Sequence, residues 1–121
     1  MKVFLSLCSV LFVLADFAVA AENRCVIGTK LGKDGKVAEK KTAFAPNEPI
    51  RMTVQSASTP HDKLLTVEVL DMHGEEMKTL WIDLKKDNSV TFPIRKLERG
   101  RYVAKAILDK KNVCEATFQI R

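Results

Sequence analysis

Apolar and polar residues alternate at period two along much of this chain, and this pattern constrains its fold more than any other feature. In the stretch 50–55 every second residue is apolar and the residues between them are polar. The same pattern recurs at 65–69, 90–94, 102–108 and 113–120. Successive side chains of a β-strand point to opposite faces, so this alternation predicts strands that are buried on one face.

Turn-forming residues lie between the alternating stretches. Asp34-Gly35 favours a tight hairpin turn. We expect a loop at Ser56–Lys63, a turn at His73-Gly74, and polar hairpin tips at Lys85–Asn88 and Asp109–Asn112. No segment has a helical pattern. Short strands at this spacing are typical of a sandwich or barrel, so we predict an all-β fold of about seven antiparallel strands.

One tyrosine narrows the choice of architecture. Residues 97–102 read L-x-x-G-x-Y at the start of the penultimate predicted strand. In immunoglobulin-like sandwiches a tyrosine at this place hydrogen-bonds back to the nearby backbone, and Gly100 supplies the turn geometry. The alternative is an ordinary buried tyrosine. Ala104 stands where antibody domains have a cysteine, and Trp81 comes too late to be their core tryptophan. The prediction is therefore an immunoglobulin-like β-sandwich in the broad sense.

Four segments form a loose frame that resembles the immunoglobulin-like accessory domains of exported bacterial proteins. They are Gly28–Leu31, Phe44–Ile50, Gly100–Tyr102 and Cys114–Ile120. The frame covers most of the chain after residue 21, and its motifs are structural. The resemblance implies first and last strands that run side by side, and a role in binding, spacing or supporting other proteins. It carries no catalytic residue onto this sequence.

The first residues have the pattern of a secretory signal. Lys2 precedes the uncharged, largely apolar run 3–14, and Ala18 and Ala20 form an A-x-A cleavage site. A spanning helix needs about 20 apolar residues, so a retained membrane anchor is the weaker alternative. We predict a signal peptide at 1–20, cleaved after Ala20 or one residue later, and a domain at 21–121 that is periplasmic or secreted.

Cleavage would remove Cys8 and leave two cysteines, Cys25 and Cys114. Because exported chains fold in an oxidising compartment, we expect these two to form a disulfide bond. The alternative is a pair of buried free thiols. Cys114 shares the expected buried face of its strand with Phe118 and Ile120, and Cys25 shares one with Ile27. A bridge between them would join the chain ends across the edge of the sandwich.

The charge is basic, with 20 Lys and Arg against 15 Asp and Glu, and both signs are interspersed. This balance is compatible with weak contact to polyanions but lacks the dense basic stripe of a nucleic-acid-binding protein. Arg95, Lys96, Arg99 and Arg101 gather around one corner and are the candidate binding residues. They would contact an anionic surface, such as an envelope glycolipid, or an acidic partner. The alternative is solvated charge that protects edges and tips from aggregation.

Residue types for catalysis or metal binding are few. The two histidines are His61 and His73. Serine and threonine lie near His61, but no nucleophile motif surrounds them, so we expect no enzyme and no catalytic residue. The stretch Met72–Met77 offers methionine, histidine and glutamate, which could hold copper; the alternative is apolar gap-filling methionines beside a solvated turn. We expect no metal site and no cofactor.

These observations predict an exported, non-catalytic immunoglobulin-like module that mediates protein or envelope interactions. Its partner would be an unidentified protein of the cell envelope, with no nucleic acid and no transmembrane anchor after cleavage. Two alternatives stay open. One is a protease inhibitor that presents the loop 56–61 on the same scaffold, and the other is a periplasmic metal-binding protein.

Overall fold

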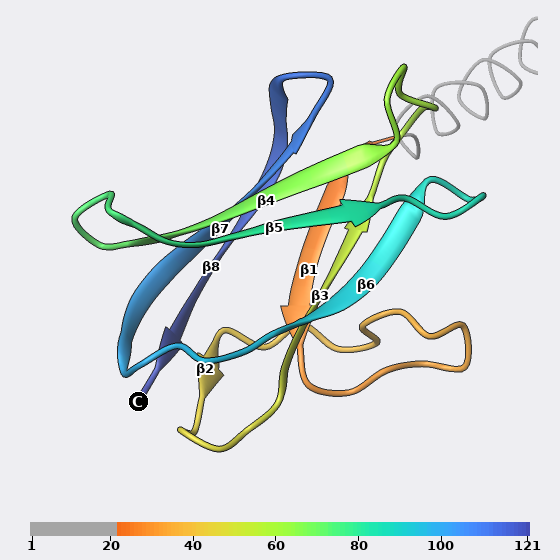
Figure 1. The fold of residues 1–121 in the computed structure, drawn as a ribbon. Coiled ribbons are helices and arrows are strands. Elements are labelled where there is room, and N and C mark those ends of the chain that lie inside the picture. The colour runs from red at the N-terminus through yellow and green to blue at the C-terminus, as the bar shows by residue number, and fades with distance from the viewer. Residues whose placement is uncertain (1–21) are drawn as a thin grey trace, which may run out of the picture.

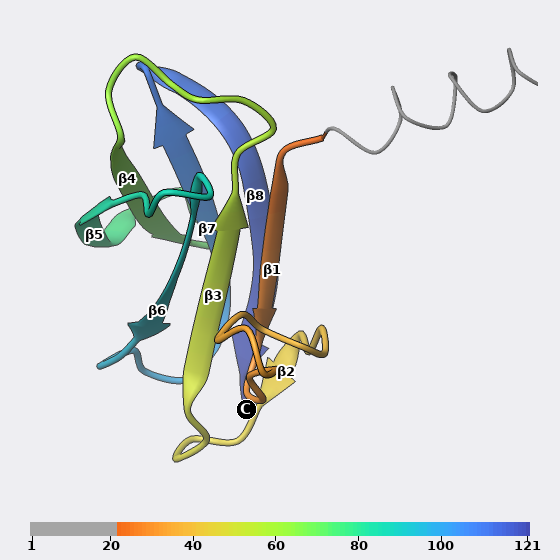
Figure 2. The same cartoon turned by 90° about the vertical axis from the view of Figure 1, so that its right-hand side faces the viewer.

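The structure is a computed structural model that describes residues 22–121, and it has two β-sheets that lie face to face (Figure 1, Figure 2). The signal peptide predicted at 1–20 lies outside the described residues. The three-stranded sheet has the order β1 (Arg24–Gly28), β3 (Ile50–Gln55), β6 (Ser89–Ile94). The five-stranded sheet has the order β2 (Ala43–Phe44), β8 (Lys111–Ile120), β7 (Gly100–Leu108), β4 (Leu64–Asp71), β5 (Glu76–Asp83). Within residues 22–121 no helix is long and apolar enough to cross a membrane.

The core lies between the two sheets and is built from the alternating residues. Met52 and Val54 of β3 are fully buried, as are Val67 and Val69 of β4. From β8 the ring of Phe118 packs into the same core and stacks on Tyr102, with ring centroids 5.5 Å apart. The predicted strands at 50–55, 65–69, 90–94, 102–108 and 113–120 are all present, and the all-β sandwich prediction is confirmed.

The tyrosine at the start of β7 makes the predicted corner. Its hydroxyl donates a hydrogen bond to the backbone oxygen of Glu98 at 2.6 Å, and its ring is buried. Burial raises the pKa of Tyr102, so the hydroxyl keeps its proton for this bond. Gly100 has a φ of 154°, a conformation that residues with a Cβ rarely adopt.

Cys25 and Cys114 form a disulfide bond between the two sheets, with their Cα atoms 5.7 Å apart. Cys25 lies on β1 of the three-stranded sheet and Cys114 on β8 of the five-stranded sheet. The first and last strands therefore lie side by side, although no backbone ladder joins them (Figure 2). The bridge fixes the two sheets to each other along this side of the sandwich.

The segment between β1 and β2 covers part of the outer face of the three-stranded sheet. Its tip is the expected Asp-Gly turn, in which the Gly35 N–H donates to the Gly32 oxygen at 3.0 Å. The Val37 N–H donates to the Thr53 hydroxyl at 2.8 Å, so that this outward-facing threonine is buried. A Cβ at Gly28 would lie 2.3 Å from the Glu39 backbone oxygen. Glycine at position 28 therefore allows this close approach.

Three features differ from the sequence-based expectation. The segment Lys85–Asn88 forms a turn, but it is not a hairpin tip, because it connects β5 to β6 of the opposite sheet. The eight strands among residues 22–121 agree with the expected number of about seven, but one pairing, β2 with β8, is parallel and not antiparallel. The additional long strand is β5, which no alternating pattern had indicated. By contrast, Asp109 and Lys110 form the expected hairpin tip, both with the positive φ of a type I′ turn.

Candidate functional site

The four predicted binding cations are all exposed, and two of them, Arg95 and Lys96, line a pocket. Arg95 and Lys96 follow β6 and line a pocket at one end of the sandwich. Arg99 precedes β7, and Arg101 lies on the outer face of β7 opposite Gln119. Neither Arg99 nor Arg101 lines the pocket. Two of the four cations therefore belong to this pocket, and the other two do not line it.

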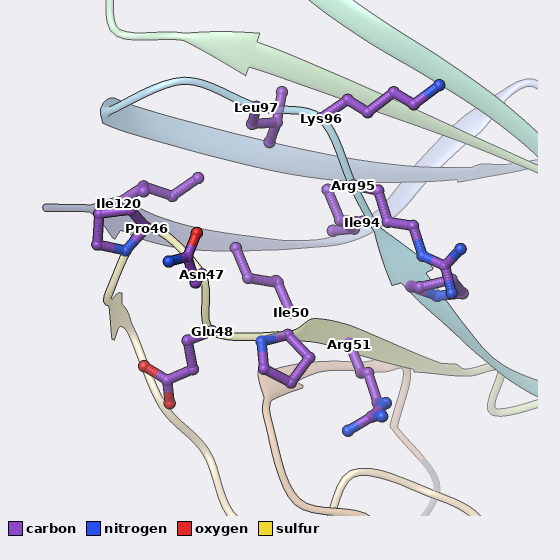
Figure 3. Close-up of a pocket in the computed structure, with 12 residues that line it drawn as sticks. Pro46, Asn47, Glu48, Ile50, Arg51, Ile94, Arg95, Lys96, Leu97 and Ile120 are labelled. Atoms are coloured by element: carbon purple, nitrogen blue, oxygen red, sulfur yellow. The ribbon is translucent and has the colours of Figure 1, made fainter.

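The pocket has a volume of about 220 Å³ and is formed by the segments Pro46–Arg51 and Pro93–Leu97 together with Ile120. Its apolar floor belongs to the core, because Ile50, Ile94 and Ile120 are buried core residues. Figure 3 shows Ile50 and Ile120 extending toward the middle of this group, while the charged ends of Arg95 and Lys96 point outward from it. The site therefore combines an apolar centre with a cationic rim.

Glu48 is the acidic residue of this pocket, and its charge is already engaged. It forms an ion pair with Lys41 and accepts hydrogen bonds from the Ala45 N–H at 3.1 Å and the Thr29 hydroxyl at 3.0 Å. The hydrogen bond from Lys41 is the main cause that lowers the pKa of Glu48 from 4.5 to about 2. The pocket thus has an excess of positive charge.

A second surface stands out because it is apolar and exposed. Leu64, Met72, Met77 and Trp81 are all exposed on the β4–β5 hairpin, and we call these four side chains the β4–β5 apolar surface; Leu64 and Trp81 lie toward the open end of the hairpin, and Met72 and Met77 lie near its turn. Trp81 is 66% exposed and Met72 is 69% exposed. Among residues 22–121 only one other large apolar side chain is exposed, Leu31. Sequence reasoning missed this surface; the run Leu80-Trp81-Ile82 was its available signal.

Next to Trp81 the outer face of the sheet is hollowed. Trp81, Thr66 and Ile107 are direct neighbours across β5, β4 and β7 and so form one row on that face. A shallow depression of about 360 Å³ is lined by Leu64, Thr66 and Ile107, with polar residues at its rim. This arrangement offers an aromatic side chain beside a hollow that another protein's side chain could enter.

The histidine loops have the character of structural turns. Asp109 accepts the N–H groups of His61 and Asp62, each at 2.9 Å, which lowers the pKa of Asp109. The Ser56 hydroxyl donates to the Ser58 backbone oxygen at 2.5 Å. In the turn after β4 the His73 N–H donates to Asp71 at 2.9 Å. Nowhere in residues 22–121 do three His, Cys, Asp or Glu side chains converge as metal ligands.

The engaged carboxylates predict that stability falls in acid. The pKa of Glu48 is about 2, and so is that of Asp87, chiefly because the Ser89 hydroxyl and then Lys36 donate to it. Each carboxylate stabilises the fold fully above its unfolded pKa, 4.5 for Glu48 and 3.8 for Asp87, and loses that contribution as pH falls toward 2. We expect the urea midpoint to fall across this window. Glu48→Gln/Asp87→Asn should be less stable than wild type at neutral pH, and its urea midpoint should change less with pH. If the midpoints of wild type and variant fall equally steeply in acid, these two carboxylates are not the cause of the acid sensitivity.

Comparison with known proteins bears on the fold alone. No family model and no curated protein sequence matches the chain. Among solved structures, it is similar to an immunoglobulin-like protein from Pseudomonas aeruginosa, with a TM-score of 0.55 and 15% identity over 84% of this chain and 98% of that one. It also matches an alkylpurine DNA glycosylase from Pseudomonas fluorescens, with a TM-score of 0.41 and 16% identity over 84% of this chain and 31% of that one. Two facing sheets, the tyrosine corner and the first of these similarities together identify the described chain as an immunoglobulin-like β-sandwich.

Proposed function

We propose that this chain is an exported immunoglobulin-like module that binds a protein partner in the cell envelope or outside the cell through the β4–β5 apolar surface. The observation that carries the proposal is that four of the five exposed large apolar side chains among residues 22–121 lie on this one hairpin, with Trp81 and Leu64 toward the same end of it. Such residues scattered singly need no explanation, but a group of them marks an interaction site.

The residue types fit a protein interface. Tryptophan and methionine are enriched at interface cores, and tryptophan is frequent among the residues that dominate binding energy. Trp81 lies beside the depression lined by Leu64, Thr66 and Ile107, so a partner side chain could pack against the indole and into the hollow at once. β5 is also the last strand of its sheet in the described chain, so its free edge could accept a partner strand.

Export is supported by two independent features. The first is the signal pattern of residues 1–20, with its A-x-A site. The second is the disulfide between β1 and β8, since such bonds persist in oxidising compartments and are rare in the cytosol. N-terminal sequencing of the protein from its source cells should give a chain that starts at Ala21 or Glu22. Recovery of the disulfide-free chain from the cytoplasm, starting at Met1, would contradict export.

Binding is tested with Trp81→Thr, which removes the indole and keeps a residue that favours strands. Immobilised wild-type protein should capture a partner from an envelope extract, and Trp81→Thr should lower that capture by about thirtyfold, as loss of a central interface residue does. The control is Leu31→Thr, which removes the exposed apolar side chain outside the hairpin and should leave capture unchanged.

Both variants should unfold within about 1 kcal/mol of wild type, since both side chains are exposed. A partner that binds wild type and Trp81→Thr equally would exclude the β4–β5 apolar surface as its contact site.

A further inference from the structure

We infer that the pocket at the end of the sandwich, between Pro46–Arg51 and Pro93–Leu97, binds a short-chain to medium-chain aliphatic carboxylate. This goes beyond the proposed protein interaction, because it concerns a small ligand at a different set of residues. Three observations carry it: the apolar floor, the unbalanced positive charge of the rim and the size of the hollow.

The floor would receive the aliphatic part of the ligand. Ile50, Ile94 and Ile120 are 3–7% exposed, so the exposed part of each lies at the boundary between core and solvent. Leu97 packs against the same core from the segment after β6. A hydrocarbon chain placed here would remove its own methylene groups from water and extend the core outward. Each methylene group buried in this way strengthens binding about fourfold.

The rim would receive the carboxylate. Arg51, Arg95 and Lys96 line the pocket, against one acid, Glu48, whose charge is engaged by Lys41. Arg51 uses one N–H on the Thr29 backbone oxygen at 2.5 Å. Within residues 22–121 the ion pairs are Lys36–Asp87 and Lys41–Glu48, so Arg95 and Lys96 take part in none. In Figure 3 their charged ends point away from the floor, and their long, flexible side chains would have to turn inward to meet an anion placed over it.

The backbone conformation before Leu97 places an apolar side chain on the core next to charged side chains at the rim. Lys96 has a φ of 62°, in the left-handed region that a lysine seldom adopts. On its two sides, Leu97 is packed on the core while Arg95 is exposed. The Arg95 backbone oxygen accepts a hydrogen bond from the Lys78 ammonium group of β5, which fixes this segment and adds a further cation near the rim.

The size of the hollow selects a small ligand. Its volume of about 220 Å³ lies below the ~300–1,000 Å³ that is usual for sites of drug-sized molecules. A chain of several methylene groups with one carboxylate is of suitable size, whereas a folded partner would need a wider surface. The expected ligand is therefore a monocarboxylate, with binding that improves as its chain grows until the pocket is filled.

The test is a titration of the full domain with sodium octanoate, followed by the backbone amide signals of Ile50, Ile94 and Leu97 in two-dimensional nuclear magnetic resonance spectra. Octanoate should shift these signals at millimolar concentration. Hexanoate should bind about fifteenfold more weakly, because it has two fewer methylene groups, each of which contributes about fourfold. Octanol, which has the chain without the charge, and acetate, which has the charge without the chain, should both bind far more weakly.

Matched variants separate the pocket from general charge. Arg95→Gln/Lys96→Gln should weaken octanoate binding about tenfold, as expected for loss of charge-assisted hydrogen bonds. Arg99→Gln/Arg101→Gln removes the same charge from residues that do not line the pocket and should change binding less than about twofold. The amide spectra of both variants also report whether they are folded.

Several outcomes would overturn the inference. These are no octanoate binding, octanol or acetate binding as tightly as octanoate, and equal effects of the two double variants. A peptide with a C-terminal leucine that shifts the same amides while octanoate does not would assign the pocket to a polypeptide terminus instead.

Discussion

Replacement of Cys25 and Cys114 by alanine is expected to lower the free energy of unfolding by about 4–5 kcal/mol. The bridge spans a sequence separation of 89 residues, and a closed loop of that length strongly restricts the unfolded chain. Most domains of this size have a total stability of about 5–15 kcal/mol, so the variant should be close to unfolding at physiological temperature.

The measurement is urea unfolding of the oxidised wild type, the reduced wild type and Cys25→Ala/Cys114→Ala. Reduced wild type keeps both sulfur atoms and loses only the covalent link, so it separates the effect of the link from that of side-chain packing. A loss below about 1 kcal/mol in both samples would contradict a major stabilising role for the bond.

Phe118→Ala is expected to lower the free energy of unfolding by about 3–5 kcal/mol, the second of the two largest effects. Phe118 is 2% exposed and lies between two other rings, stacked on Tyr102 and edge-on to Phe44 at 6.2 Å. Phe44 comes from the short β2 and Tyr102 from the corner of β7, so the cavity would loosen two separate attachments of β8.

Thermal and urea unfolding would measure this change. Thr117→Ala, on the exposed face of the same strand, is the matched control and should change stability by less than about 0.5 kcal/mol. Similar losses for Phe118→Ala and Thr117→Ala would mean that strand propensity, and not the aromatic cluster, determines the stability of β8.

The strands that could be predicted from sequence are those with one buried face. β3, β4, β7 and β8 each place an apolar row against the opposite sheet, and this row produces the alternation. β5 was missed because it is an edge strand in the described chain, with side chains such as Trp81 and Met77 left exposed. Apolar residues on both faces of such a strand erase the period of two.

The sequence pattern also could not predict which of the two sheets each strand joins. A polar turn such as Lys85–Asn88 has the same composition whether it returns to the neighbouring strand or crosses to the other sheet. What distinguishes the two cases is the pairing of β6 with β3, and that depends on residues about 40 positions apart.

The candidate site was predictable only in part for a similar reason. Arg95 and Lys96 were visible as a basic cluster, but their pocket is completed by Glu48, Ile50 and Ile120 from distant segments. Arg101 belongs to the same cluster in sequence, yet the alternation of β7 places it on the outer face because Tyr102 points inward. Closeness along the chain therefore does not decide which of these cations line the pocket.

The link between β1 and β8 also determines how this domain would respond to mechanical tension. A pull applied at residue 22 and residue 121 would travel through the covalent bond from Cys25 to Cys114. Residues 26–113, which include most of the core, would be bypassed by this bond, so the load would act on the segments 22–25 and 114–121 and on the pairing of β8 with β7 and β2. As a link in a chain of proteins, the domain would extend only by the length of these two end segments, and only after residues 115–120 of β8, with Phe118 and Ile120, separate from the sheet.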